Sequence, residues 1–465
     1  MSLMKKCKIT KRYLAINLTC SEDIEGFLRT LGVNYKKRSD SYIIEPWDLI
    51  CFLDLITKSG WSIELRVNTD FKTDIFSDKK VELRNYQKNI LKRVKQNNFR
   101  AIIILPTGAG KTILALKIMQ ILGAKTLVVV PTIDLLYQWK SKMVNVMGVN
   151  EANIGLFGGG KKELKQITIT TYQSAINPDN LNRFMDFFGL VIFDEVHRIG
   201  YRYIEIAKRL IAPFRIGLSA TLEDKEKRAM LSRYIGKVIQ EYETDQLILS
   251  GYLADYELKL IKVSLSKTER KRYLAWVKKY ANYLEMEGLK KVKGKISKIL
   301  MKKAETDPEA REALKAIRNA RDLAFFPKSK IEAIEKILMQ HKKDKVIIFT
   351  RHKRVAGIIS YLFCIPLITG ETPSNLRKEF LRLFRENKLS KLVAAEALDE
   401  GIDIPGASVG IIVSGRASNR QYVQRIGRLL RPKGGKKAII YELVTEGTIE
   451  EKVSRVRKQV NLNNI

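Results

Sequence analysis

The chain has 465 residues, 45% of them hydrophobic, which is enough to fill several cores and predicts about two to four domains. Its 85 Lys and Arg residues against 50 Asp and Glu residues give a net charge of +35. That excess favours a polyanionic partner such as nucleic acid over a lysine-rich surface that only keeps the protein in solution.

No apolar run reaches the roughly 18 residues of a membrane span, and the N-terminus lacks the apolar stretch of a signal peptide. We therefore expect no membrane partner and a place inside the cell, cytoplasmic in a prokaryotic or archaeal cell and nuclear in a eukaryotic one. The cysteines Cys7, Cys20, Cys51 and Cys364 form no CxxC pair and lie beside no histidine. We expect no zinc site, iron–sulfur cluster or disulfide framework.

Residues 1–78 differ in pattern from the rest of the chain. They mix a period-two stretch, "KITKRYLAINLTC", with a helical one, "SEDIEGFLRTLG", and predict a small separate α+β domain. Their 12 basic and 11 acidic residues nearly cancel. This balance favours a docking or shape-reading module over an electrostatic clamp.

Residues 79–245 contain short β-branched runs separated by helical stretches, which predicts a doubly wound α/β domain with a parallel sheet. The runs are "AIIIL" (101–105), "TLVVVP" (126–131), "ITITT" (167–171), "LVIFDE" (190–195) and "RIGLSAT" (215–221). Functional sites in such sheets form at the carboxyl ends of the strands, so the residues just after each run are candidates.

The stretch "LPTGAGKT" (105–112) lies between the first run and a helical stretch. It matches a variant of the phosphate-binding loop, because Leu105 stands where the full pattern has glycine. A glycine-rich turn without a ligand is the alternative, but glycines let backbone N–H groups converge on a phosphate, and the Lys and Thr that follow can bind phosphate oxygens and Mg²⁺. The loop predicts an ATP and Mg²⁺ site made by Thr107, Gly108, Ala109, Gly110, Lys111 and Thr112.

The run "LVIFDEVH" supplies the acidic half of such a site. Asp194 can hold Mg²⁺, and Glu195 can orient or deprotonate the attacking water. His197 is either a surface histidine or, from its place three residues after Asp194, a link to the "SAT" segment. That segment comprises Ser219, Ala220 and Thr221.

Residues 264–325 have helical spacing and no strand signal, and their 17 basic and 8 acidic residues give +9. We expect a thumb-like helical insertion. Aromatic residues interleave with lysines, and they either contact nucleic acid or form the core of the insertion; they are Tyr273, Trp276, Tyr280 and Tyr283. The candidate DNA-backbone contacts are Lys290, Lys291, Lys293 and Lys295.

A second series of runs predicts another doubly wound domain over 246–465, which carries the insertion. The runs are "KVIIFT" (345–350), "KLVAAEA" (391–397), "VGIIVS" (409–414) and "KAIIYEL" (437–443). The fold class is thus α/β, with two doubly wound parallel-sheet domains, a small α+β N-terminal domain and a helical insertion.

The stretch "QRIGRLLRP" (424–432) follows the third run of this second series. Phosphoryl transfer spreads negative charge over oxygens that a planar guanidinium from another domain can stabilise. Arg428 and Arg431 are three residues apart and can face one cleft, and Gln424 can position water or the γ-phosphate. We expect these residues to act across domains on ATP bound at residues 107–112.

Taken together, these motifs resemble those of superfamily 2 helicases, and of the XPB family among them, over residues 80–460. "LRNYQ" (83–87) looks like the adenine-recognising motif and implicates Gln87 and Arg84, while "DEVH" is the XPB form of the acidic box. The resemblance implies DNA contacts by Pro131, Thr132 and Thr171, from "VVPTIDLLYQW" and "TTYQSA". It also places Gly401 and Asp403 of "EALDEGIDIP" where the family couples nucleotide state to DNA grip.

The resemblance implies that the two parallel-sheet domains are RecA-like, and it places residues 1–78 where the family has a damage-recognition domain and residues 264–325 where it has a helical thumb. It also implies an ATP-dependent DNA helicase or translocase that acts on duplex, forked or damaged DNA in repair or transcription. Two alternatives remain: a scaffold whose ATPase times its stay on DNA and presents a nuclease or another repair or transcription partner, and an RNA helicase. The chain departs from the family at Leu222, which stands where an Arg-Glu-Asp motif would begin, before Glu223 and Asp224. This segment therefore does not by itself imply strand separation.

Overall fold

The computed structural model describes residues 5–59, 61–76, 79, 81–106, 108–222, 224–241, 256–289, 296–395, 407–414 and 438–451. The chain divides into two compact units, residues 1–249 and 250–465. Both units contain a mainly parallel sheet with helices, so the predicted α/β class with two RecA-like domains is confirmed. No helix within the described parts of the chain is long and apolar enough to span a membrane.

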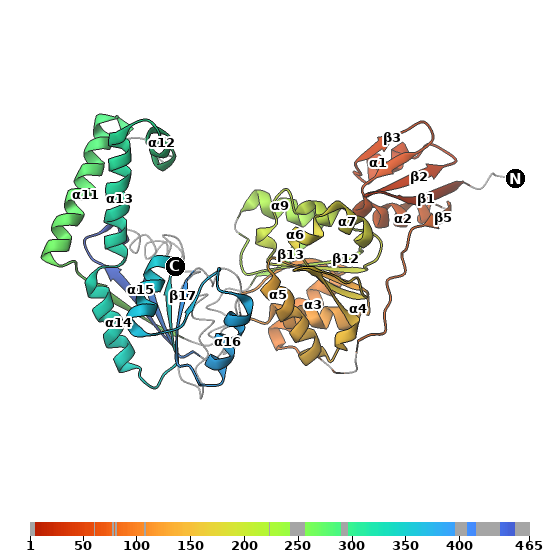
Figure 1. Cartoon of the computed structure of the whole chain (residues 1–465). Coiled ribbons are helices and arrows are strands. Elements are labelled where there is room, and N and C mark those ends of the chain that lie inside the picture. Colours follow the sequence, from red (N-terminus) through yellow and green to blue (C-terminus); the bar gives the residue numbers. More distant parts are fainter. Residues whose placement is uncertain are drawn as a thin grey trace. The chain divides into compact units, whose positions relative to one another are not determined.

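The first unit begins with a small five-stranded sheet in the order β3-β4-β2-β1-β5 (Figure 1). Its strands alternate between buried and exposed residues, because one face packs on α1, α2 and the loop residues Met185 and Ile211 while the other faces solvent. The elements are β1 (Lys6–Arg12), β2 (Ala15–Cys20), α1 (Glu25–Thr30), β3 (Tyr35–Lys37), β4 (Tyr42–Ile44), η1 (Pro46–Asp48), α2 (Leu49–Lys58) and β5 (Ser62–Arg66).

The sequence analysis expected no disulfide framework, but the structure has a disulfide between Cys7 and Cys20. The two residues lie directly opposite each other in the antiparallel pair β1–β2, with their Cα atoms 4.0 Å apart. The hairpin register brings them together, and the 13-residue spacing in the sequence gave no sign of it. Cys51 and Cys364 are not in disulfides.

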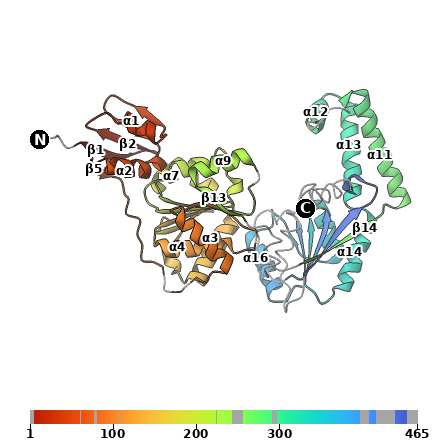
Figure 2. The same ribbon diagram turned by 180° about the vertical axis from the view of Figure 1, so that it is seen from behind.

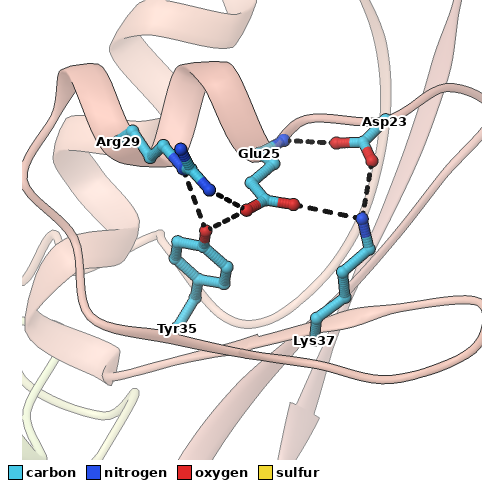
Figure 3. A network of polar contacts seen from close by, with 5 residues as sticks. All are labelled: Asp23, Glu25, Arg29, Tyr35 and Lys37. Atoms are coloured by element: carbon cyan, nitrogen blue, oxygen red, sulfur yellow. Dashed lines mark hydrogen bonds and ion pairs between the residues drawn. The ribbon is translucent and has the colours of Figure 1, made fainter.

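A polar network ties α1 to β3 on the surface of this small sheet (Figure 3). The Glu25 carboxylate accepts hydrogen bonds from Arg29 at 2.6 Å, from the Tyr35 hydroxyl at 2.6 Å and from Lys37 at 3.1 Å. The hydrogen bond from Tyr35 is the main cause that lowers the pKa of Glu25 to about 2, and the one from Lys37 lowers the pKa of Asp23 to about 2. The network is exposed to water, so its contribution to stability is limited.

The small sheet packs on the rest of the first unit. The β1–β2 turn lies against α7 (Pro178–Phe184) and the residues that follow it: Lys11 pairs with Asp186 at 2.5 Å, and the Tyr13 hydroxyl donates to Asp179 Oδ1 at 3.2 Å. Met185 and Ile211 belong to the core of the small sheet. Residues 1–78 thus belong to the same compact unit as residues 79–249. A domain boundary at residue 78 stays a prediction of the sequence.

The large sheet of the first unit has the order β13-β6-β12-β11-β7-β10-β8-β9 and is parallel except for β9. Its central strands are buried along their whole length, as the β-branched runs predict. Its strands are β6 (Arg100–Ile104), β7 (Thr126–Val130), β8 (Ile154–Gly158), β9 (Lys161–Lys162), β10 (Ile167–Thr171), β11 (Leu190–Asp194), β12 (Phe214–Ser219) and β13 (Lys237–Glu241). The sequence analysis did not predict β8, β9 and β13.

Helices cover both faces of this sheet, with α6, α7 and α9 on one face and α3, α4 and α5 on the other (Figure 1). The helices are α3 (Asn85–Gln96), α4 (Lys111–Leu122), α5 (Ile133–Lys142), α6 (Tyr172–Ala175), α7 (Pro178–Phe184), α8 (Ile204–Lys208) and α9 (Lys225–Tyr234). Short turns of other helix types are η2 (Met143–Met147), η3 (Glu151–Asn153) and η4 (Val196–Arg198).

The second unit has a six-stranded parallel sheet in the order β14-β19-β18-β15-β17-β16. Its strands are β14 (Tyr256–Val263), β15 (Val346–Thr350), β16 (Leu367–Ile368), β17 (Lys391–Ala395), β18 (Val409–Ser414) and β19 (Ala438–Thr445). Residues of α14 (Lys328–Gln340) and α15 (Lys353–Phe363) share one core cluster, and α16 (Ser374–Arg385) contributes to another. The strand β14, which the sequence analysis missed, lies at an edge, where charged residues interrupt its apolar pattern.

Residues 264–325 form helices α11 (Lys267–Met286), α12 (Ile296–Lys303) and α13 (Pro308–Phe325), with α11 and α13 side by side (Figures 1 and 2). An alanine stripe on α13 lets the two helices approach closely; it comprises Ala310, Ala313, Ala316, Ala320 and Ala324. Tyr273 and Tyr283 are buried, and Trp276 and Tyr280 are half-buried against the same clusters. The aromatic residues therefore form the core of the helical pair, which was one of the two interpretations that the sequence left open.

Candidate nucleotide site

The glycine-rich loop joins β6 to α4 at the carboxyl edge of the large sheet. Gly108 and Gly110 have φ values of 83° and 76°, which residues with a Cβ rarely adopt. A Cβ on Gly110 would lie 2.5 Å from Gln87 Nε2, so only glycine fits there. The first turn of α4 has no side-chain cap, which leaves its N–H groups directed at the space in front of the loop.

Residues of α3 hold the loop from behind. The Tyr86 hydroxyl donates to Ala109 O at 2.5 Å, and Gln87 Nε2 donates to the carbonyls of Ala109 and Gly110, each at 3.2 Å. Gln87 Oε1 accepts from Arg84 N at 2.9 Å, and Arg84 is exposed. In this structure Gln87 thus positions the loop, while the sequence interpretation had connected it with adenine.

Lys111 and Thr112 begin α4, where the sequence analysis had expected phosphate and Mg²⁺ contacts. Lys111 Nζ donates to Leu105 O at 3.1 Å, across the mouth of the loop. Thr112 Oγ1 accepts from Lys142 Nζ at 3.3 Å. The preceding loop residue, Thr107, lies outside the described residues.

Asp194 ends β11 and is 7% exposed. Its Oδ2 accepts from the indole Nε1 of Trp139 at 2.8 Å, and its Oδ1 accepts from Glu195 N at 3.0 Å. Burial, and next the neighbouring Glu195 carboxylate, raise the pKa of Asp194 to about 6, while Lys111 lowers it. Two neighbouring carboxyl groups, of which Asp194 is buried and Glu195 is half-buried, are stabilised by a cation, and together with the loop they fit an Mg²⁺-bound nucleotide phosphate.

Glu195 has a left-handed conformation with φ 52° and ψ 53°. This conformation is unfavourable for a residue with a Cβ and is typical of functional positions. His197 Nδ1 lies 3.2 Å from Glu195 Oε2 and 3.1 Å from Ser219 Oγ. Ser219 Oγ in turn donates to Thr221 O at 2.7 Å, so the acidic box and the "SAT" segment are in contact through His197. Ala220, the middle residue of that segment, has only a methyl side chain, which can neither donate nor accept a hydrogen bond.

The segment after Thr221 begins with a buried leucine. Leu222 is 6% exposed and belongs to the core cluster that includes Leu231 and Tyr234. Asp224 Oδ1 accepts from Lys227 N at 3.0 Å and caps α9. An apolar core residue thus stands where the family has a charged one. Glu223 lies outside the described residues.

The expected DNA contacts lie at the carboxyl ends of two neighbouring strands, β7 and β10. Pro131 and Thr132 follow β7, and Thr171 ends β10. Thr132 Oγ1 caps α5 by accepting from Leu135 N at 3.3 Å, and Thr171 Oγ1 caps α6 by accepting from Ser174 N at 3.1 Å.

A cavity of about 390 Å³ lies beside Thr171 at the end of β8. Gly158, Gly159 and Gly160 form one wall with positive φ values of 149°, 61° and 87°. The other lining residues are mostly polar or basic: Lys161, Lys162, Gln173, Ser174, Asn177, Asp179, Asn180 and Arg183, beside Phe157. The sequence analysis missed this cavity, although three glycines followed by two lysines after an apolar run was a signal for it.

The remaining predicted site residues lie outside the described residues. They are Gly401, Asp403, Gln424, Arg428, Arg431, Lys290, Lys291, Lys293 and Lys295. The functional neighbours that sequence reasoning missed are Trp139, Lys142 and Tyr172, which contact Asp194 or Thr112 from α5 and α6.

Known proteins share these features. Residues 80–224 match the family described as the res subunit of type III restriction enzymes, and residues 329–433 match the helicase conserved C-terminal domain. The helicase domain of Hef from Pyrococcus furiosus has the same fold, with a TM-score of 0.54 and 20% identity over 83% of this chain and all of that one.

Two curated relatives have the same family name. A "DNA 3'-5' translocase XPB2" of Sulfurisphaera tokodaii is 40% identical over 82% of this chain and 85% of that protein. A "DNA 3'-5' helicase XPB" of Mycobacterium tuberculosis is 27% identical over 90% of this chain and 71% of that protein. The motifs, the two parallel sheets and these similarities lead to one conclusion: the chain belongs to the XPB family of superfamily 2 helicases and translocases.

Proposed function

We propose that the protein is an ATP-dependent DNA helicase or translocase of XPB type, which couples ATP hydrolysis to the opening or distortion of duplex DNA in repair or transcription. The observation that supports this most is the convergence of three motifs at one sheet edge. The glycine-rich loop, the pair Asp194 and Glu195, and the "SAT" segment lie at the carboxyl ends of β6, β11 and β12, which are neighbours in the sheet.

The residues at this edge have complementary roles in the proposal. The backbone of Gly108–Gly110 and the ammonium group of Lys111 bind phosphate oxygens, and Thr112 and Asp194 would hold Mg²⁺. When bound, Mg²⁺ neutralises phosphate charge during transfer. Glu195 orients the attacking water and accepts its proton. His197 connects Glu195 to Ser219 and can communicate the state of the nucleotide.

The other strand ends of the same sheet support a nucleic-acid path. Thr132, Thr171 and the glycine cavity lie at the ends of β7, β10 and β8, which are adjacent in that order. Main-chain N–H groups and the basic residues Lys161, Lys162 and Arg183 suit backbone phosphates, which position a strand without reading its sequence. Both activities thus use one edge of one rigid sheet.

Residues of the second unit complete the proposal. Arg428, Arg431 and Gln424 would act on ATP across the units, with Gly401 and Asp403 coupling nucleotide state to DNA. Residues 264–325 would hold the DNA backbone, where α11 and α13 expose basic side chains such as Lys271, Lys278, Arg318 and Arg321.

Residues 1–78 of the first unit would recognise damaged DNA or dock a repair, transcription or nuclease partner.

Measurements of ATP binding and ATP hydrolysis test the site. Lys111→Ala should weaken ATP binding, because it removes the cation that faces the phosphates. Glu195→Gln should bind ATP and lose turnover by at least about 100-fold, since it keeps the nucleotide contacts and loses the water-orienting carboxylate. Glu205→Gln is a matched control, because Glu205 is a paired carboxylate of the same unit outside the site. Normal hydrolysis by Glu195→Gln would contradict the assignment.

A comparison of nucleic acids tests the substrate. ATPase activity should rise more with duplex or forked DNA than with RNA, and a labelled strand or a roadblock should be displaced. Stimulation by RNA alone would favour the RNA-helicase alternative. Stimulation by DNA without displacement of a strand or roadblock would favour the scaffold that presents a partner.

A further inference from the structure

Helix α5 extends from the strand ends of the large sheet to the nucleotide site. At its N-terminus, the Thr132 side chain caps the helix beside the end of β7. Its ten residues span roughly 15 Å, at about 1.5 Å per residue. One short and rigid element thus reaches both parts of the proposed motor.

The C-terminal half of α5 contacts both residues expected to hold Mg²⁺. Trp139 is 1% exposed, and its indole N–H donates to Asp194 Oδ2 at 2.8 Å. One turn later, Lys142 Nζ donates to Thr112 Oγ1 at 3.3 Å. Since Asp194 Oδ1 accepts from Glu195 N, the bond from Trp139 fixes the second oxygen and therefore the plane of the carboxylate.

Helix α6, on the other face of the sheet, makes a similar connection between a strand end and Asp194. Its cap, Thr171, lies at the end of β10, and the next residue, Tyr172, donates from its hydroxyl to Asp194 O at 2.8 Å. Tyr172 is 3% exposed. Two of the proposed DNA contacts, Thr132 and Thr171, therefore each cap a helix that sends one buried aromatic donor to Asp194.

We infer that Trp139 is a positioning residue, which couples DNA contact at the Thr132 end of α5 to the orientation of the Asp194 carboxylate, and that Tyr172 supports the same coupling through α6. The inference rests on the proposed function and names how its two activities communicate. Trp139 reaches the nucleotide only through Asp194. A contact path alone does not demonstrate transmission, so the test measures a coupling free energy.

The experiment compares the full chain with Trp139→Phe, which keeps an aromatic ring and removes the N–H donor. The affinity for a non-hydrolysable fluorescent ATP analogue with Mg²⁺ is measured with and without duplex DNA, and the affinity for that DNA with and without the analogue. The two ratios must agree in each protein, because coupling is reciprocal. Trp139→Phe should reduce the wild-type ratio about fivefold or more, toward one, with DNA affinity in the absence of nucleotide within about twofold of wild type.

Trp47→Phe is the matched control. Trp47 Nε1 also donates to a carboxylate, Glu45 Oε2 at 2.9 Å, but it lies in η1 and its ring contacts Tyr234 of α9 instead of a residue of the nucleotide site. This variant loses the same kind of bond and should keep the wild-type coupling ratio. If Trp139→Phe does not fold, as judged by circular dichroism, Tyr172→Phe removes only a hydroxyl group and should reduce the ratio as well.

An unchanged coupling ratio in the folded variants would overturn the inference. A fall in analogue affinity by the same factor with and without DNA would overturn it too, because Trp139 would then only hold Asp194 in place. A wild-type protein that binds both ligands without any coupling would instead refute the proposed motor function itself, and the inference with it.

Discussion

Arg215 in the first unit and Lys330 in the second are both buried basic side chains, but they are stabilised in different ways. Arg215, which is 1% exposed, donates to four main-chain carbonyls, at 2.5–2.9 Å. Lys330, which is fully buried, donates to both Glu450 carboxylate oxygens at 2.8 Å and to Val413 O at 2.6 Å. The backbone alone holds the guanidinium of Arg215 through these bonds, whereas the ammonium of Lys330 is paired with a carboxylate as well.

The difference follows from the shapes of the two groups. A guanidinium has five N–H donors in a planar fork, so Arg215 can join the ends of α8 and α9 to the loop before β12. An ammonium has three donors around one point and pairs better with a carboxylate. The main-chain partners of Arg215 stay when side chains change, whereas the main partner of Lys330 can be removed by mutation. Four substitutions test how burial and hydrogen-bond partners stabilise charged side chains in this protein, and they are given from the largest expected effect to the smallest.

Arg215→Leu should have the largest effect, a loss of about 4–6 kcal/mol in unfolding free energy, because four buried carbonyls lose their donors and water does not replace them. Urea unfolding followed by circular dichroism measures the loss. Arg215→Lys should lose less but remain clearly destabilised. A wild-type midpoint for Arg215→Lys would show that the planar fork is not needed.

Lys330→Met should lose about 3–4 kcal/mol, because it leaves the Glu450 carboxylate buried without its cation. Burial already raises the pKa of Glu450, and Lys330 opposes that rise. The double variant Lys330→Met with Glu450→Gln should regain more than half of the loss, since a neutral amide needs no cation. If the double variant is no more stable than the single one, the ion pair is not what holds this site.

Asp48→Asn should stabilise the protein above neutral pH. Asp48 is 4% exposed, and its Oδ2 has no hydrogen-bond partner among the described residues. Burial, and next Glu45, raise its pKa to about 7, although Arg233, Arg215 and Arg100 lower it. The folded state therefore keeps a proton that the unfolded chain releases near pH 4, and stability falls as pH rises from about 4 to about 7.

The Asp48→Asn variant removes this loss. The expected gain at pH 8 is at most about 4 kcal/mol, because each unit of pKa is worth about 1.4 kcal/mol. Below about pH 4, both states of the wild type are protonated and the two proteins should differ little. Unfolding midpoints over this pH range measure the effect, and a constant difference across the range would contradict it.

Arg29→Gln should have the smallest effect. Arg29 pairs with Glu25 on the exposed surface network of the small sheet (Figure 3), where solvent and salt screen charges. Its unfolding midpoint should lie close to the wild type at low salt, and the remaining difference should vanish at about 1 M salt. A large shift that persists in salt would mean that the network acts as a buried one does.

Local pattern was enough to predict much of the first unit. The buried runs around 101–105, 126–131, 167–171 and 190–195 are strands within one residue of their expected limits, because a strand buried on both faces needs a continuous β-branched run. The glycines at 108 and 110 predicted a left-handed loop, and both have positive φ values. These features depend on residues that are adjacent in the sequence, and the sequence alone can therefore predict them.

Edge strands and contacts between residues far apart in the sequence were not predictable in this way. The strands β13 and β14 lie at sheet edges, where charged residues break the apolar pattern. The pairing of Cys7 with Cys20 depends on the register of a hairpin, and the aromatic residues of 264–325 face inward because α13 presents alanines to them. The disulfide and the inward-facing aromatic residues depend on which residue of the partner strand or helix lies opposite them in the folded chain.

The sequence by itself determined the family, the presence of two parallel sheets one after the other along the chain, and the chemical groups at the ends of their strands. The tertiary structure alone decided that Trp139 and Tyr172 reach Asp194 over 55 and 22 positions of chain, and that Arg215 is buried among carbonyls. The physical reason is that a hydrogen bond between distant residues depends on how elements pack, and nothing in the spacing of those residues along the chain specifies that packing.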